Sequence, residues 1–190
     1  MVCVKYVAAF AALLGASACE KSTQQQAVPA YYDVAGYVDK QIAALSKVKP
    51  TVIKRAQMAG NTQHLTLKTL NWSRELELFK QADINKPALR QSYATARPDS
   101  LTYLYTLKPT EKNLTVRRLM VQLDSATHQP RRIEATLATQ NPLYNSERRI
   151  VLESGLNQAD QWAIQHYRLS GFQHLVIADK KAFDVEGTVQ

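Results

Sequence analysis

Apolar residues recur every three or four positions in two segments of the chain. This spacing predicts a helix over residues 33–47, with Asp33 as its N-cap and the lysines before Pro50 near its end. A second helix is predicted from Asn71 or Ser73 to about residue 83, because its apolar residues also fall on one face. A further helical turn is expected from Pro87 through Tyr93, followed by a loop over residues 94–99.

Alternating apolar and polar residues predict strands elsewhere. Residues 51–58 and 62–69 flank Ala59-Gly60-Asn61, which is typical of a hairpin. From Leu101 onward the period is two, and turn-forming residues separate five predicted strands, which lie around Leu101–Leu107, Leu119–Leu123, Ile133–Leu137, Ile150–Leu152 and Trp162–Ile164. After Gly171 we expect one more strand at Leu175-Val176-Ile177 and then a polar tail.

Short loops between these strands favour an antiparallel arrangement. The sequence therefore predicts an α+β fold: an antiparallel β-meander of five or more strands, preceded by a β-hairpin and covered on one face by two amphipathic helices. A closed or half-open β-barrel is the alternative. Residues 31–190 are expected to form a single domain.

Composition limits the class of protein. The chain has 190 residues, 45% hydrophobic and 21% charged, which fits a globular domain and excludes a collagen-like or globally disordered chain. No segment reaches the roughly 18 apolar residues of a transmembrane helix. The formal net charge of +8 favours anionic partners such as lipid headgroups or acidic polymers.

The first nineteen residues have the order of an export signal. Lys5 precedes an apolar run over residues 6–14, and small residues follow. Ala16-Ser17-Ala18-Cys19 resembles a bacterial lipobox, which implies cleavage after residue 18 and acylation, palmitate included, of Cys19. Residues 1–18 would be the signal peptide and residues 19–30 the lipidated cysteine with a flexible tether. An ordinary cleaved signal followed by a cysteine is the alternative.

The predicted cellular location is the cell envelope. Glu20, rather than aspartate, follows the cysteine, and by resemblance to Gram-negative lipoproteins this implies transfer to the outer membrane. No run of acidic residues, which accompanies surface export in some lipoproteins, follows the cysteine, and this favours the periplasmic face. Export also excludes nucleic acid as a partner. The segment from Trp72 to Tyr93, with Asp83-Ile84-Asn85-Lys86-Pro87, resembles envelope lipoproteins of Bacteroidetes over about residues 31–155. That resemblance implies the fold and the location, and it implies no activity.

Enzyme signatures are absent from the sequence. It contains no G-x-S-x-G, no phosphate-binding glycine loop and no H-E-x-x-H, and its histidines lack the spacing of zinc ligands. Glu75 and Glu77 are two residues apart and are predicted to be solvated helix charges rather than a catalytic pair. We therefore expect no catalytic residue, no metal and no cofactor.

Three arginine pairs lie inside predicted strands, so one arginine of each pair points toward the core side. Aligning apolar residues across the strands predicts one row that contains Tyr105, Arg117, Leu137, Arg148 and His166. Such a row predicts an apolar pocket with a cationic rim, suited to an anionic amphiphile. In the alternative interpretation the two arginines pair with Glu75, Glu77, Asp83 or a backbone carbonyl.

These observations lead to three functional hypotheses. The first is a non-enzymatic, membrane-anchored envelope lipoprotein that binds a partner or ligand in the periplasm. The second is a carrier or sensor of an anionic amphiphile, a lipid or fatty acid, that uses Arg117, Arg148, His166 and Tyr105. The third, an envelope hydrolase, is disfavoured because no nucleophile and base can be paired in the sequence.

Overall fold

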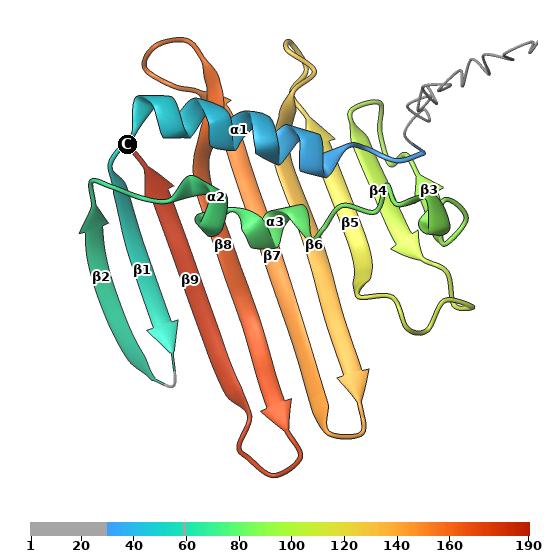
Figure 1. The fold of residues 1–190 in the computed structure, drawn as a ribbon. Coiled ribbons are helices and arrows are strands. Elements are labelled where there is room, and N and C mark those ends of the chain that lie inside the picture. Colours follow the sequence, from blue (N-terminus) through green and yellow to red (C-terminus); the bar gives the residue numbers. More distant parts are fainter. Residues whose placement is uncertain (1–29, 59) are drawn as a thin grey trace, which may run out of the picture.

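The computed structural model describes residues 30–58 and 60–190, and the predicted signal peptide, the acylation at Cys19 and the tether up to residue 29 lie outside this range. In the described part, nine strands form one antiparallel sheet (Figure 1). Its order is β2-β1-β9-β8-β7-β6-β5-β4-β3. The strands are β1 (Val52–Met58), β2 (Asn61–Leu67), β3 (Tyr93–Ala96), β4 (Thr102–Leu107), β5 (Val116–Leu123), β6 (Pro130–Asn141), β7 (Tyr144–Leu156), β8 (Trp162–Leu175) and β9 (Lys181–Val189).

The predicted meander and the preceding hairpin are confirmed. Strands β3 to β9 follow one another across the sheet, and β9 then pairs with β1, which joins the hairpin to the meander. Within the described residues β2 and β3 remain edge strands, so the sheet is open and the alternative of a closed barrel is wrong.

Three short predictions near the ends of the meander are wrong. Tyr93 and residues 94–96 form β3, where the end of a helical turn and a loop were expected, and the predicted polar tail forms strand β9. Leu175 ends β8, and a turn rather than a strand follows at Val176 and Ile177. Strand β9 has only a weak apolar alternation in its sequence, because Phe183, Val185 and Val189 are separated by charged and small residues.

Helix α1 (Val34–Val48) confirms the first predicted helix, and the Asp33 side chain accepts a hydrogen bond from the Gly36 amide at 2.8 Å. The second predicted helix is instead two single turns, α2 (Trp72–Glu75) and α3 (Glu77–Lys80). Leu76 leaves the helical conformation between them, at φ −96° and ψ 2°, and buries its side chain completely. A 3-10 turn, η1 (Pro87–Leu89), starts at the predicted proline.

All three α-helices lie across the same face of the sheet, here called the inner face, and Figure 1 shows that they cross only its upper part. The Tyr37 hydroxyl donates to Ser154 Oγ at 2.6 Å, and the Gln41 amide oxygen accepts from the Ile164 amide at 3.0 Å. These contacts attach α1 to β7 and β8. The core beneath the helices contains Val38, Leu76, Phe79, Leu119, Val121, Ile133, Ile150, Leu152, Ile164 and Tyr167.

The lower part of the inner face has no helix over it (Figure 1). One row of strand pairs there runs from Leu137 through Arg148, Gly171 and Phe183 to Met58. Phe183 is partly buried and Met58 is exposed. The sheet thus has a helix-covered half and an uncovered half on the same face.

Candidate functional site

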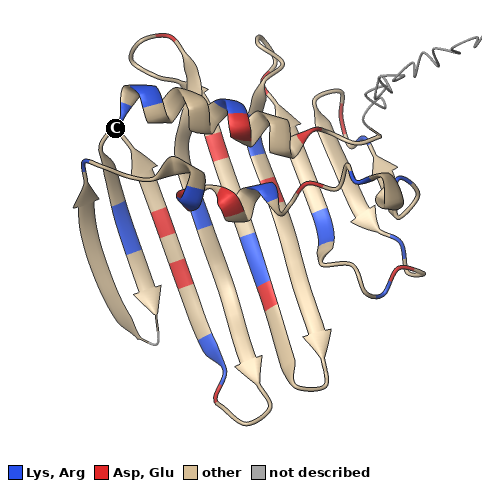
Figure 2. Cartoon of the chain, viewed as in Figure 1, with Lys and Arg blue, Asp and Glu red and all other residues tan. Residues whose placement is uncertain are grey.

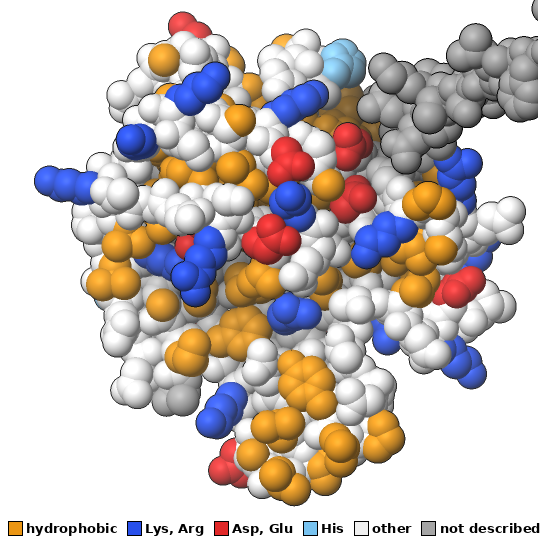
Figure 3. All heavy atoms as spheres, viewed as in Figure 1, with side chains coloured by type: hydrophobic (Ala, Val, Ile, Leu, Met, Phe, Trp, Pro, Cys, Tyr) orange, Lys and Arg blue, Asp and Glu red, His pale blue; other side chains and the backbone are white. Residues whose placement is uncertain are grey.

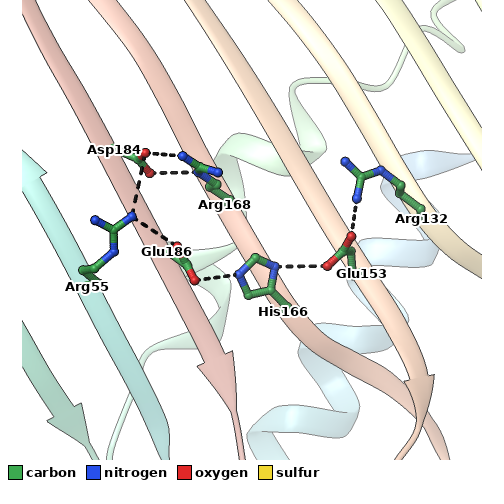
Figure 4. Close-up of polar contacts among 7 residues, drawn as sticks. All are labelled: Arg55, Arg132, Glu153, His166, Arg168, Asp184 and Glu186. Atoms are coloured by element: carbon green, nitrogen blue, oxygen red, sulfur yellow. Dashed lines mark hydrogen bonds and ion pairs between the residues drawn. The ribbon is translucent and has the colours of Figure 1, made fainter.

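The outer face of the sheet, opposite the helices, carries a network of charged side chains (Figure 4). At its β1 end, the Arg55 guanidinium lies 3.4 Å from a Glu186 carboxylate oxygen and 3.9 Å from one of Asp184. Arg168 on β8 pairs with the same Asp184, and its Nε–H donates at 3.0 Å. Acidic and basic side chains alternate across β1, β9 and β8 here (Figure 2), so each charge meets an opposite charge.

The network continues through His166 toward β6. His166 Nε2 lies 3.3 Å from Glu186 and its Nδ1 lies 3.3 Å from Glu153, which also pairs with Arg132. Arg132 and Arg149 both bind Glu134, with nitrogen–oxygen distances of 2.9 Å and 2.7 Å. The charged contacts therefore form one continuous network across five strands, β1, β9, β8, β7 and β6.

These contacts favour the ionised carboxylates. The Arg168 guanidinium holds the pKa of Asp184 below its ordinary value. Burial pushes the pKa of Glu134 upward, but hydrogen bonds from Arg132 and the charge of Arg149 outweigh it and leave that pKa lowered. Burial also pushes the pKa of Glu186 upward, but hydrogen bonds from His166 and Arg55 outweigh this effect and leave that pKa lowered. The outer face is a self-neutralising charge lattice, in which every pair is partly solvated.

Replacing Glu134 with glutamine is expected to lower the free energy of unfolding by about 1–2 kcal/mol at pH 7, because two arginines lose a carboxylate that is only 10% exposed. Since the folded-state pKa of Glu134 is lowered, its stabilisation is present above the pKa of the unfolded state and is lost as the pH falls through the folded-state pKa. Urea unfolding at several pH values should show the two proteins converging in acid. The matched control is Glu147→Gln, which changes an exposed residue of β7 on the same outer face of the sheet. An equal loss of unfolding free energy in both variants contradicts the role of Glu134.

The inner face holds a cavity of about 350 Å³ between α2–α3 and the sheet. Glu75, Phe79, Tyr167, Leu169 and Val185 are among its lining residues. Such a volume is at the lower end of the range for small-molecule sites, and its floor is aliphatic and aromatic. The cavity adjoins the uncovered half of the inner face, because Leu169 and Val185 lie one row above Gly171 and Phe183.

Three polar side chains that line this cavity, Lys54, Glu75 and Tyr167, contact one another. The Lys54 ammonium lies 2.6 Å from Glu75 Oε1, and the Tyr167 hydroxyl donates to the same oxygen at 2.8 Å. Burial, together with the Glu75 carboxylate, raises the pKa of Tyr167, so this hydroxyl remains a donor at neutral pH. The Glu75 side chain is only 15% exposed, so the prediction of a solvated helix charge is wrong. It fixes α2 to β1 and β8.

Arg148 lies on the uncovered half of the inner face. It is opposite Leu137 on one side and Gly171 on the other, and it is partly buried. No carboxylate or carbonyl among the described residues binds it, so the predicted pairing with Glu75, Glu77 or Asp83 does not occur there. The Arg148 guanidinium therefore has no anionic partner among the described residues.

The predicted row of five residues is wrong as an arrangement, although its central pair, Leu137 opposite Arg148, is confirmed. A bulge between Val116 and Arg118 puts Val116 opposite Leu137 and displaces Arg117, which donates to the Lys112 carbonyl at 2.9 Å. Arg117 lines a separate pocket of about 640 Å³ with the loop after β4.

His166 and Tyr105 also leave the predicted row. A register shift between Glu153 and Ser154 puts Leu152 opposite Tyr167 and sends His166 to the outer face. Tyr105 stays on the inner face, but it is buried opposite Leu119, and its hydroxyl accepts a hydrogen bond from the Tyr32 amide at 3.0 Å. Of the four predicted ligand-binding residues, Arg148 alone lies on the uncovered inner half.

Sequence analysis missed the cluster of Lys54, Glu75 and Tyr167. Lys54 does carry a signal, because it occupies an inward position of a strand whose neighbours at i±2, Val52 and Ala56, are apolar or small. A lysine at such a position requires an acid nearby. Glu75 was the available acid, because it lies in the second helix, which was predicted to pack on the sheet.

Comparison with known proteins identifies no relative. No family model, no curated protein and no solved structure matches this chain. Within the described residues no helix is long and apolar enough to span a membrane, and no group of three or more His, Cys, Asp or Glu side chains is placed to hold a metal ion. The site is therefore interpreted from its own geometry.

Proposed function

We propose that the protein is a non-enzymatic, lipid-anchored protein of the cell envelope that binds an anionic amphiphile against the uncovered half of its inner face. The observation that carries this proposal is the position of Arg148, a partly buried cation on the inner face that binds neither an acid nor a carbonyl among the described residues. On the same face, Leu137 lies opposite Arg148 on the neighbouring strand, and Phe183 and Met58 lie farther along the same row, beyond Gly171.

The geometry suits a ligand with one charged end and one apolar end. A carboxylate or phosphate group would bind the Arg148 guanidinium, which offers several donors in a planar fork. An acyl chain would extend over Leu169 and Val185 toward the cavity beneath α2 and α3. Removing apolar surface from water supplies the affinity, at about 0.8 kcal/mol per methylene, and the arginine supplies orientation.

The envelope location is part of the same proposal and rests on the residues before the domain. The lipobox-like segment ending at Cys19 supports anchoring at the outer membrane, with the domain in the periplasm. Several acyl chains on one cysteine hold a soluble domain at a bilayer for long times. A protein anchored there meets free amphiphiles where they arise.

Native mass spectrometry of protein extracted from its own membrane in mild detergent tests both parts. We expect the N-terminal peptide to carry acyl chains on Cys19 and the folded protein to retain an amphiphile. Arg148→Gln is expected to lower the retained fraction about 10-fold, whereas Arg118→Gln, an exposed change on the outer face, should leave it unchanged.

This experiment tests the lipid anchor and the ligand site separately. A mature N-terminus that begins elsewhere, or an unmodified Cys19, contradicts the anchor and leaves the binding result standing. An acylated protein that retains no amphiphile, or retains it equally after Arg148→Gln, contradicts the ligand site. Unfolding midpoints of both variants establish that each is folded.

A further inference from the structure

Exposed aliphatic side chains gather at the end of the sheet farthest from α1. Four residues, here called the apolar tip, are Leu143, Leu175, Val176 and Ile177, which are 72%, 49%, 64% and 94% exposed. They lie on the β6–β7 and β8–β9 turns, and the Val176 amide donates to the Leu143 carbonyl at 3.1 Å. Figure 3 shows hydrophobic side chains clustered at this lower end of the molecule.

Such a cluster requires an explanation. Single exposed apolar residues are common, but contiguous ones cost solvation free energy and mark a surface that contacts something else. Turn geometry does not require these aliphatic residues, because turns are most often built from Gly, Pro, Asn, Asp and Ser. A hydrogen bond between the two turns holds them side by side.

The shape and charge of the tip favour a bilayer as the partner. The side chains project outward from two turns rather than lining a groove, and a fluid bilayer accepts a convex apolar projection without a matching pocket. Lys180 and Lys181 follow Ile177 after Ala178 and Asp179, and Asp179 is the only acid in that turn. The Lys180 ammonium lies 3.7 Å from the Phe172 ring centroid. Cations just behind an apolar tip sit at the depth of lipid headgroups.

We propose that the apolar tip inserts into the interfacial region of an anionic lipid bilayer, with Lys180 and Lys181 at the headgroups. Insertion buries Val176, Ile177 and Leu143 among acyl chains, and the net charge of +8 strengthens the approach to an anionic surface. This contact is independent of acylation at Cys19 and of the amphiphile at Arg148. It orients the lower end of the sheet, with its uncovered inner face, toward a membrane.

Flotation of the Cys19→Ser protein, which has no acyl anchor, on vesicles of equimolar phosphatidylcholine and phosphatidylglycerol tests the proposal. We expect the protein to float with these vesicles. Val176→Ser combined with Ile177→Ser should weaken binding about 10-fold or more, because two aliphatic side chains no longer enter the bilayer. The matched control is Val48→Ser combined with Leu156→Ser, which removes two similarly exposed aliphatic groups at 62% and 54% exposure outside the tip, and it should bind as before.

The lysines have a separate signature. Lys180→Gln combined with Lys181→Gln should weaken binding to the anionic vesicles about 10-fold at low salt, and raising the salt should remove the difference from the parent protein. The proposal is overturned if the Cys19→Ser protein does not float, or if the tip variant and the control variant bind equally. Circular dichroism confirms that each variant is folded.

Discussion

Gly187→Ala is expected to lower the free energy of unfolding by about 3 kcal/mol. A Cβ atom at this position would lie 2.1 Å from Cζ and 2.4 Å from the hydroxyl oxygen of Tyr167, far inside van der Waals contact. Tyr167 is buried and its hydroxyl is bound to Glu75, so the ring cannot move without breaking that hydrogen bond. Forcing an extra carbon into a packed site has this order of cost.

A double-mutant cycle separates this clash from an intrinsic preference for glycine. In a Tyr167→Leu background the far end of the ring is gone, so Gly187→Ala should cost under about 1 kcal/mol. Gly155→Ala is the matched control, because its new Cβ would meet only the flexible end of the Gln165 side chain at 3.1 Å. Guanidinium unfolding gives all the values. An equal cost of Gly187→Ala in both backgrounds contradicts the proposed contact.

Leu76→Ala is expected to destabilise the protein by about 3–4 kcal/mol. Leu76 is fully buried at the junction of α2 and α3, and its removal leaves a cavity between these turns and the sheet. Single helical turns have almost no stability of their own, so their place on the sheet depends on such side chains. Hydrogen exchange should accelerate first in residues 72–80.

The control for this prediction is Leu156→Ala, which makes the same chemical change at a side chain that is 54% exposed. We expect it to change stability by less than about 0.5 kcal/mol. If Leu76→Ala cost no more than this control, the helical turns would not be packed on the sheet as observed. The cavity lined by Phe79 and Tyr167 would then lack a fixed wall.

The consecutive order of β4 to β8 was predictable because it depends on local signals, whereas β3, β9 and the pairing of β9 with β1 were not predicted. Period-two alternation and short turns place β4 to β8 in a meander, and matching apolar positions correctly pairs Leu119 with Ala135 and Leu152 with Ile133. Helix α1 was also predictable, since Asp33 caps it and its apolar face recurs over a long segment. These features need only neighbouring residues to form.

Two of the register shifts in the sheet displaced predicted site residues, and these shifts were not predictable in the same way. An extra residue in one strand reverses which side chains face inward beyond it, and no residue type marks the position uniquely. The shift at Glu153 and Ser154 therefore carried His166 away from the predicted site, and the one at Val116 displaced Arg117. The Gln41 side chain, which binds the Ile164 amide close to the first of these shifts, comes from a helix more than a hundred residues earlier.

The sequence by itself determined the consecutive order of β4 to β8, the first helix, the basic charge and the inward position of Arg148, because alternation and capping act over a few residues. The tertiary structure alone decided that the helices cover half of the inner face, that Lys54, Glu75 and Tyr167 meet, and that Arg148 has no acid partner among the described residues. Those outcomes depend on which distant segments share a surface. That is settled only when the whole sheet and its bulges are in place.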